Sequence, residues 1–369
     1  MALKALFVNT YVSGVQFYRV KMPVDGMTKM FKKDQFVMTW YKPDTFEMER
    51  WEWQLYEPDK TGHIYAHLDA ACRWADVVVW MGLHTPKALD IFVHMRAKHG
   101  KPFVSEFDDF IFSIPKANSA FGAYKPGTEY TRIALEQIKR SDALIVSTPH
   151  LKEIYKPFNN RVYCVENAID HAPWLRPRKT SPRQGAITIG WMGGGTHNED
   201  HEMIQDAVLE VLDKCPNSRF TYISGCPPPK KYEGVKRLKW SHAFKAIDKY
   251  PGWIAKQGFD IGIAPLVDNE FNRAKSNLRW LEYSAMGIPT VASPLLHFKQ
   301  SIRHGKTGFI ASSHAEWVKF LTLLVNEPDV RENVGAAARQ AVLKDWNPQV
   351  QARKYRAALG EIADAFTDT

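Results

Sequence analysis

Short apolar runs alternate with amphipathic helical patterns along most of the chain, and this alternation limits the fold more than any other feature. Helical patterns occupy 127–140 and 201–214, among others. Strands that alternate with helices form parallel sheets covered on both faces, so we predict an α/β fold. The first half has five predicted strands, at 3–9, 76–80, 102–106, 143–147 and 162–165. The second half has six, at 186–191, 220–224, 235–240, 258–264, 290–293 and 308–310.

A chain of 369 residues is too long for one ordinary core, which indicates two domains. The alternation of strands and helices stops after Asp170 and starts again near residue 185. Between these points three prolines stand among basic residues, a composition typical of a linker. Near Trp346-Asn347-Pro348 the helical pattern of the tail breaks, so the last helix can turn away from the second domain and pack on the first. The predicted parts are two Rossmann-like domains over 1–170 and 185–346, a linker over 171–184 and a crossover helix over 347–369.

Composition excludes several classes of protein. Hydrophobic residues at 45% and charged residues at 24% are globular values, and no stretch of about 20 apolar residues is present. The N-terminus lacks the pattern of a signal peptide, so we expect a cytoplasmic protein without a transmembrane segment, although peripheral membrane contact stays open. Four widely spaced cysteines indicate reduced thiols rather than disulfides or zinc.

The net charge of +9 comes mostly from the second half, where basic residues gather at 176–183 and 230–239. Such patches suit an anionic donor, a nucleic acid or an anionic glycolipid surface, and an ordinary solvated surface is the alternative.

A glycine loop follows the first strand of the second half. Gly193, Gly194 and Gly195 let the backbone approach a diphosphate closely, and the helix that starts after them favours anions. A tight turn without a ligand is the alternative interpretation. Thr196 either caps this helix or belongs to the site, and His197 either touches a phosphate or is simply exposed. The spacing is neither a dinucleotide fingerprint nor a P-loop, which disfavours a nicotinamide enzyme.

A second segment, 271–293, combines a cation, a carboxylate and a helix stop between two apolar strands. In such β-α-β units ligands bind at the carboxyl ends of the strands. Lys275 is placed to meet a phosphate, and Glu282, two helical turns further, can accept hydrogen bonds from ribose hydroxyls. The segment therefore predicts a nucleotide site.

Together these motifs resemble the GT-B glycosyltransferases, in which two Rossmann-like domains flank a donor cleft. The resemblance implies that Gly193–Gly195 hold the donor diphosphate, that Lys275 neutralises it with Ser276 beside it, and that Glu282 holds the ribose. Residues 165–170 are similar to the interdomain Asn-Gly-Ile-Asp segment of the family, with Ala168 in place of the glycine. In many retaining members a second glutamate stands eight positions before the one on the ribose. Here that position is Ala274, so the stereochemistry stays open.

The first domain supplies further candidates. Gly14 permits close approach of a ligand, and Arg19 either binds a phosphate or forms a structural salt bridge. Glu106, Asp108 and Asp109 cluster at the end of an apolar strand; crowding raises the pKa of one acid, and Asp108 or Asp109 could then act as general base. Helix capping or pairing with Arg19 is the alternative. His84, after another strand, could reach the donor sugar. Residues 106–115, with Gly14-Val15, Tyr18-Arg19 and Pro23 upstream, resemble glycosyltransferases encoded by bacteriophages, which would place the protein in the host cytoplasm.

We therefore predict a glycosyltransferase of the hexosyl or another class, with a nucleoside-diphosphate sugar as donor and a hydroxyl group as acceptor. Positive side chains and helix dipoles replace a metal on this interpretation, and no cofactor is expected. A base at Asp108 or Asp109 implies inversion, whereas proton transfer to the leaving phosphate implies retention. The acceptor is either hydroxymethylated pyrimidine in phage DNA or a surface polysaccharide, lipid-linked glycan or protein. A sugar-nucleotide epimerase and a non-catalytic nucleotide-binding protein on the same fold are the rival predictions.

Overall fold

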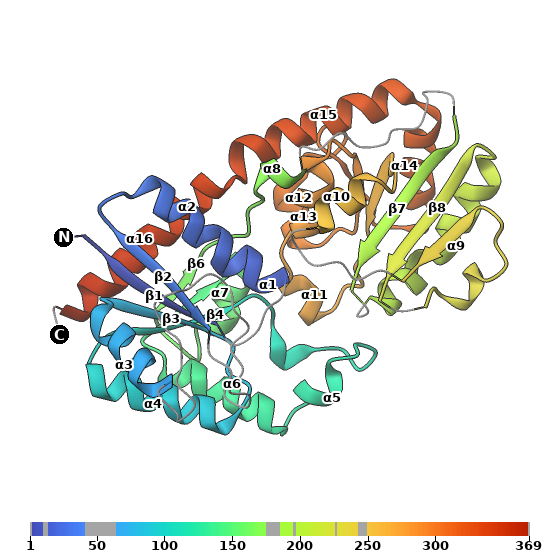
Figure 1. Cartoon of the computed structure of the whole chain (residues 1–369). Helices are drawn as coiled ribbons and strands as arrows, with labels where there is room; N and C mark the ends of the chain where they lie inside the picture. The colour runs from blue at the N-terminus through green and yellow to red at the C-terminus, as the bar shows by residue number, and fades with distance from the viewer. Residues whose placement is uncertain are drawn as a thin grey trace. The chain divides into compact units, whose positions relative to one another are not determined.

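The computed structural model describes residues 2–9, 14–40, 64–174, 185–194, 197–225, 227–242 and 249–367. Contacts between residues divide the chain into two units. Unit 1 consists of Met1–Phe112, Ala123–Glu166 and Pro348–Thr369, and unit 2 consists of Ser113–Gly122 and Asn167–Asn347. Each unit holds one six-stranded sheet in which all the strands are parallel (Figure 1). The prediction of two parallel sheets with covering helices is therefore confirmed.

The sheet of unit 1 has the strand order β2-β1-β3-β4-β5-β6. Its strands are β1 (Lys4–Asn9), β2 (Gln35–Trp40), β3 (Val77–Met81), β4 (Phe103–Phe107), β5 (Ala143–Val146) and β6 (Val162–Cys164). The strand β2 was not predicted. It lies at the edge of the sheet and alternates buried Phe36 and Met38 with more exposed neighbours, so it lacks the continuous apolar run of the central strands.

Helices follow the strands of unit 1 in the expected order. They are α1 (Gly14–Gln16), η1 (Phe17–Lys21), α2 (Met22–Met30), α3 (Ile64–Trp74), α4 (Pro86–His99), α6 (Glu129–Arg140) and α7 (Pro149–Tyr155). Local signals set their ends. Thr85 accepts a hydrogen bond from the backbone N of Ala88 to start α4, and Gly100 ends that helix with a φ of 57°. Two short turns, η2 (Ile111–Ser113) and α5 (Phe121–Tyr124), flank the 113–122 segment.

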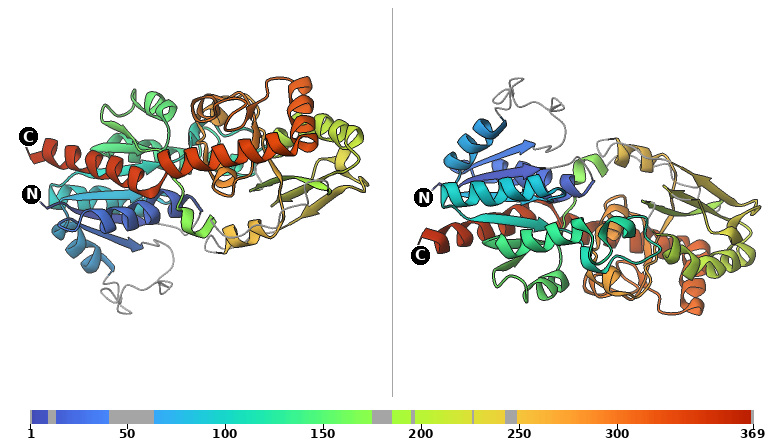
Figure 2. Two further views of the ribbon diagram at one scale, coloured as in Figure 1. Left: turned by 90° about the horizontal axis from the view of Figure 1, so that it is seen from above. Right: turned by 90° about the horizontal axis from the view of Figure 1, so that it is seen from below.

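The C-terminal helix α16 (Pro348–Thr367) belongs to unit 1 and packs along α2 (Figures 1 and 2). The preceding helix, α15 (Pro328–Asp345), ends where Asn347 donates hydrogen bonds to the carbonyls of its last turn. Pro348 then starts α16, as proline favours a first helical turn. A side chain at Gly26 of α2 would lie 3.1 Å from the carbonyl oxygen of Pro348, so glycine allows this close packing. The tail thus consists of two helices that are separated at Trp346 and Asn347.

The sheet of unit 2 has the strand order β12-β11-β10-β7-β8-β9. Its strands are β7 (Ile187–Gly193), β8 (Ser218–Ser224), β9 (Leu238–Ser241), β10 (Ile261–Ala264), β11 (Thr290–Ala292) and β12 (Phe309–Ile310). Its other helices are α8 (His171–Trp174), α9 (Asn198–Lys214), η3 (Lys230–Tyr232), α10 (Tyr250–Ala255), α11 (Glu270–Ala274), α12 (Leu278–Ala285), α13 (Leu296–Ser301) and α14 (His314–Asn326). Apolar residues of α9 and α14 pack on one face of the sheet, and those of α12 pack on the other.

Candidate active site

The carboxyl end of β7 carries the described part of the glycine loop. A side-chain carbon at Gly193 would lie 2.5 Å from the ring of Trp191 and 3.3 Å from Nη2 of Arg279. Glycine is therefore required here because an indole and a guanidinium pass close to the backbone. At Gly194 the same carbon would meet nothing within 4 Å, so this backbone is open to a ligand. Gly195 and Thr196 lie outside the described residues.

The amino end of α9 follows this loop, and a buried carboxylate organises it. Asp200, 4% exposed, accepts hydrogen bonds at Oδ1 from the backbone N of Val267 (2.7 Å) and from Nδ2 of Asn272 (3.1 Å). Its Oδ2 lies 2.7 Å from Nδ1 of His197. A carboxylate only accepts hydrogen bonds, so Nδ1 carries a proton and Nε2 is the ring atom left for a ligand. Asp200 thus ties α9 to α11 and to the loop after β10.

Lys275 lies directly after α11, and its ammonium group stands 4.4 Å from the ring centre of Phe271. Beside it, Ser276 accepts a hydrogen bond of 2.9 Å from Nδ2 of Asn167, which belongs to the segment that resembles the interdomain motif. The two sequence motifs therefore meet within unit 2. The hydrogen bond holds the turn at Ser276, and the Phe271 ring packs against the ammonium group of Lys275.

Arg279, four residues after Lys275 and in the first turn of α12, was not among the predicted site residues. Its Nη1 donates to Oε2 of Glu282 over 2.7 Å, and Glu282 itself is 4% exposed. Burial lowers the pKa of His197, Asp200 opposes that shift, and the positive charges of Lys275 and Arg279 lower the pKa further. These cations therefore act on the same ring at the start of α9. The spacing of Arg279 and Glu282, three residues apart in a helix, was the available signal for this pair.

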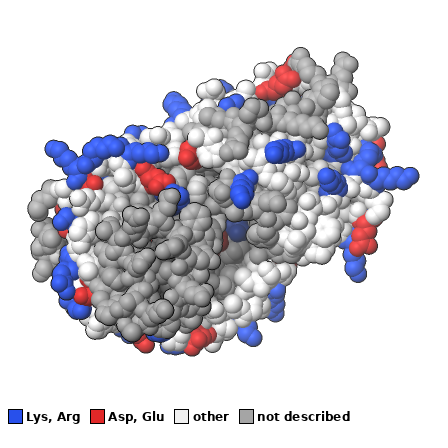
Figure 3. All heavy atoms as spheres, viewed as in Figure 1, with Lys and Arg blue, Asp and Glu red and all other residues white. Residues whose placement is uncertain are grey.

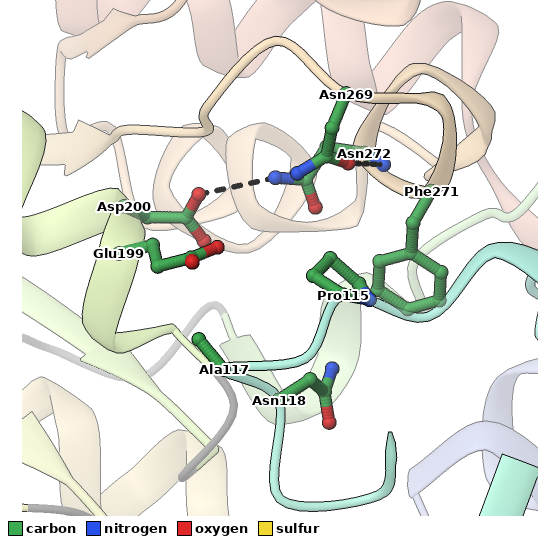
Figure 4. Close-up of a pocket in the computed structure, with 8 residues that line it drawn as sticks. All are labelled: Pro115, Ala117, Asn118, Glu199, Asp200, Asn269, Phe271 and Asn272. Carbon is green, nitrogen blue, oxygen red and sulfur yellow. Dashed lines mark hydrogen bonds between the residues drawn. The ribbon is translucent and has the colours of Figure 1, made fainter. Parts of the chain in front are cut away.

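A small pocket opens beside this cationic group, and we name it the α9–α11 pocket (Figure 4). Its walls come from the start of α9, from α11 and from the 113–122 segment. The lining residues are Pro115, Ala117, Asn118, Glu199, Asp200, Asn269, Phe271 and Asn272. A hydrogen bond of 3.0 Å from the hydroxyl of Ser113 to Glu270 holds the segment against α11. The sequence analysis did not connect Asn118 to the site, because the residues that share this pocket are far apart in the chain.

The candidates in unit 1 form a separate set. Arg19 is fully buried; its Nε lies 2.6 Å from Oε1 of Glu106, and its Nη1 donates to the carbonyl of Val165 over 2.6 Å. The hydroxyl of Tyr355 donates to the other oxygen of Glu106 over 2.8 Å. This is a structural salt bridge, the second interpretation of Arg19, and its partner Glu106 belongs to the acid cluster at the end of β4. Phosphate binding by Arg19 would require this pair to open.

The other predicted residues of unit 1 lie at the carboxyl ends of neighbouring strands. Asp108 and Asp109 follow β4, and hydroxyl groups of Ser147 and Tyr155 donate to their backbone carbonyls. His84 follows β3, its ring centre is 6.0 Å from that of Tyr130, and burial lowers its pKa. Among acids of the β4 end, burial raises the pKa of Glu106, and Asp108 adds to that shift while the Arg19 guanidinium opposes it. At Gly14, an added side-chain carbon would meet nothing within 4 Å.

The basic residues predicted at 176–183 lie outside the described residues. Those at 230–239 lie between β8 and β9 and on β9 itself, and Figure 3 shows Lys and Arg side chains gathered at that end of unit 2. Two of them already bind the protein: Lys231 pairs with Asp206 at 2.8 Å, and Arg237 donates to the carbonyls of Cys215 and Ser218. Among the described residues, no group of three His, Cys, Asp or Glu side chains is placed to hold a metal ion. No described helix is long and apolar enough to cross a membrane.

Solved structures resemble the chain over nearly its whole length. HepE from Anabaena, solved with UDP and glucose, matches with a TM-score of 0.63 and 13% identity over 97% of this chain and 100% of that chain. Sucrose-phosphate synthase from Thermosynechococcus elongatus gives a TM-score of 0.61, with 11% identity over 98% of this chain and 100% of that chain. The chain has the GT-B fold.

Two further comparisons agree with the GT-B assignment. A glycosyltransferase from Rickettsia africae gives a TM-score of 0.62, with 13% identity over 98% of each chain. Residues 233–357, which include Lys275, Arg279 and Glu282, match the family described as glycosyl transferase-like. No curated protein sequence matches the chain. None of the relatives described above is named as a bacteriophage protein, so that resemblance stays a prediction.

Proposed function

We propose that the protein is a glycosyltransferase that takes a sugar from a nucleoside-diphosphate sugar. The observation that carries the proposal is that Arg279 lies beside Gly193 at the carboxyl end of β7, and that the charges of Lys275 and Arg279 both act on His197 at the start of α9. Cations beside an open backbone and a helix amino end suit a diphosphate. The complexes of HepE with UDP and with UDP-glucose support the same class of donor.

The reaction breaks the bond between the anomeric carbon and the diphosphate oxygen, and it forms a bond from that carbon to the acceptor oxygen. The departing diphosphate gains negative charge, which Lys275, Arg279 and the start of α9 would stabilise. Glu282 would accept hydrogen bonds from the ribose, with Ser276 next to the phosphates. The proton of the acceptor would pass to Asp108 or Asp109 in an inverting reaction, or to the leaving phosphate in a retaining one.

For the acceptor we propose a hydroxyl group on a glycan. One structural relative is named as a galactosyltransferase of the lipopolysaccharide outer core, which favours an acceptor of this class. A hydroxymethylated pyrimidine in DNA is the second candidate, and it rests on the basic residues between β8 and β9. DNA binding through such residues would weaken steeply as salt increases.

Calorimetric titration with UDP and UDP-glucose tests the donor, followed by measurement of UDP release with and without acceptor. We expect UDP release to depend on a glycan acceptor. Release that is equally fast without any acceptor, or donor affinity unaffected by Lys275→Ala, would overturn the proposal. Conversion of the donor sugar without UDP release would instead indicate an epimerase. Parallel reactions with hydroxymethylated DNA at low and high salt separate the two acceptor classes.

A further inference from the structure

The α9–α11 pocket adjoins the cationic group through two shared residues. Asp200 lines the pocket and binds His197, while Phe271 lines the pocket and lies under the ammonium group of Lys275. Because Asp200 and Phe271 border both the pocket and the cationic group, a sugar attached to a diphosphate bound by those cations would lie next to the pocket. This step depends on the proposed donor class, because it places the diphosphate beside Lys275.

The polar groups of the pocket include both donors and acceptors. Asn118 is 7% exposed, and its Oδ1 accepts from the backbone N of Ala120 over 2.9 Å, which leaves Nδ2 as a donor. Asn272 uses its Nδ2 for Asp200 and for the carbonyl of Val267. Figure 4 shows Nδ2 of Asn118 and the amide oxygen of Asn272 turned toward the same space, with the carboxylate of Glu199 beside them. Sugar hydroxyls donate and accept at once, so they suit such a mixed set.

Two other properties narrow the occupant. The ring of Phe271 and the side chain of Pro115 give the pocket an apolar wall, which suits the C–H face of a pyranose. The charged residues among its described lining are Glu199 and Asp200, both acidic. Asp200 is engaged by its three donors, whereas Glu199 is exposed and would repel an anionic group.

We propose that the residues at the mouth of the α9–α11 pocket contact the sugar of the nucleotide-sugar donor and select a neutral sugar over one that carries a carboxylate. Asn118 and the amide oxygen of Asn272 bind the hydroxyl groups, and Glu199 disfavours a uronic acid. Lys275 and Arg279 bind the diphosphate that all such donors share. Specificity for the sugar thus comes from residues other than those that bind the nucleotide.

The test measures the dissociation constants of UDP, UDP-glucose and UDP-glucuronic acid for the whole chain and for two variants. Asn118→Asp keeps an oxygen that can accept the hydrogen bond from the backbone N of Ala120, and it removes the amide Nδ2 that donates into the pocket. We expect the affinity advantage of UDP-glucose over UDP to fall about tenfold, as loss of one buried hydrogen bond implies. Lys116→Gln, at an exposed residue that does not line the pocket, is the matched control and should leave that advantage unchanged.

Glu199→Gln provides a gain of binding that misfolding cannot produce. We expect it to narrow the preference for UDP-glucose over UDP-glucuronic acid by about fivefold, because it removes one partly solvated charge repulsion. The pocket proposal is overturned if Asn118→Asp weakens UDP and UDP-glucose equally, or if Glu199→Gln leaves the preference unchanged. If UDP itself does not bind the unaltered chain, the proposed function has failed, which is a different result from the loss of sugar selectivity.

Discussion

The imidazole of His197 and the carboxylate of Asp200 lie 2.7 Å apart at the start of α9. Because the carboxylate holds the proton on Nδ1, Nε2 of the neutral ring presents a lone pair to any ligand. A bound diphosphate would repel that lone pair and favour protonation of Nε2. Binding of the proposed donor should therefore take up a proton at neutral pH, where burial keeps the pKa of His197 below 6.5.

Asp200→Asn tests this coupling. Its amide nitrogen can donate to Nδ1, so the neutral ring would carry its proton on Nε2 and could donate to a phosphate without taking up a proton. We expect UDP affinity to decline between pH 6 and pH 8 in the unaltered chain and to decline less in the variant. Calorimetry in buffers of different ionisation enthalpy measures the proton uptake directly, and equal uptake by both chains would contradict the prediction.

Lys275→Ala should weaken UDP about 10- to 100-fold, the loss expected when one charge-assisted contact to a phosphate is removed. Lys319→Ala is a matched control, because Lys319 also stands over a phenyl ring, that of Phe320, at 5.7 Å. It lies on α14, outside the candidate site, so UDP binding should be unchanged. Equal losses in the two variants would mean that Lys275 does not contact the nucleotide.

His201 is a buried histidine whose two ring nitrogens have no hydrogen-bond partner among the described residues. Its ring packs at 4.2 Å from Trp191 and 4.5 Å from Tyr222, and burial keeps its pKa well below 6.5. Since the unfolded chain binds this proton first, the histidine lowers the free energy of unfolding as pH falls below about 6.5, by up to about 1.4 kcal/mol per pH unit.

His201→Phe should therefore leave stability at pH 7.5 nearly unchanged or higher and reduce its loss between pH 6.5 and pH 5. Urea unfolding at several pH values measures the difference. His94→Phe, at an exposed position of α4, serves as the control and should not alter the slope. If His201→Phe changes the free energy of unfolding by the same amount at every pH, the substitution acts through packing and not through the titration of His201.

Arg19→Met should lower the free energy of unfolding by about 3–5 kcal/mol, because it leaves the buried carboxylate of Glu106 without its cation. Lys21→Met breaks the exposed pair with Asp25, 48% exposed on both sides, and should change stability by less than about 1 kcal/mol. If Arg19→Met leaves the free energy of unfolding unchanged but abolishes UDP binding, the result would favour phosphate binding by Arg19 over a structural role.

Gly193→Ala should destabilise the chain by about 1–3 kcal/mol, since the added carbon would overlap the ring of Trp191. Gly194→Ala, one residue further, meets no atom within 4 Å and should be tolerated in stability. A donor assay separates the two effects: if Gly194→Ala weakens UDP without destabilising the chain, the open backbone there lies against the ligand.

Local sequence patterns predicted the central strands well, because β3, β5, β7 and β10 are continuous apolar runs with turn residues at their ends. They failed at β2, where an edge strand carries polar residues on its exposed side. The helix that carries Glu282 before β11 also followed from spacing, whereas the separate short helix α11 before Lys275 was not predicted. Each of the predicted features depends on neighbours in the sequence, which is why one chain sufficed to predict them.

The missed residues depend on contacts between distant segments. Asp200 binds Val267 and Asn272, some seventy residues further along, and an acid in the first turn of a helix has an ordinary explanation in the helix dipole. In the sequence, Arg279 likewise has the pattern of an exposed residue on a helix. Asn118 comes from a segment outside every motif. The sequence did not show which acid of the 106–109 cluster pairs with Arg19. Glu106 is buried on β4, whereas Asp108 and Asp109 follow the strand.

The assignment of the 113–122 segment to unit 2 has a practical consequence for engineering. The chain passes from one unit to the other four times, at residues 112–113, 122–123, 166–167 and 347–348. Neither unit can therefore be excised as one uninterrupted length of polypeptide. A fragment that starts at the proline-rich stretch would retain Lys275 and Arg279 but lack a wall of the α9–α11 pocket. Domain exchange with a relative would have to transplant this ten-residue piece as well, or the hybrid would combine two specificities.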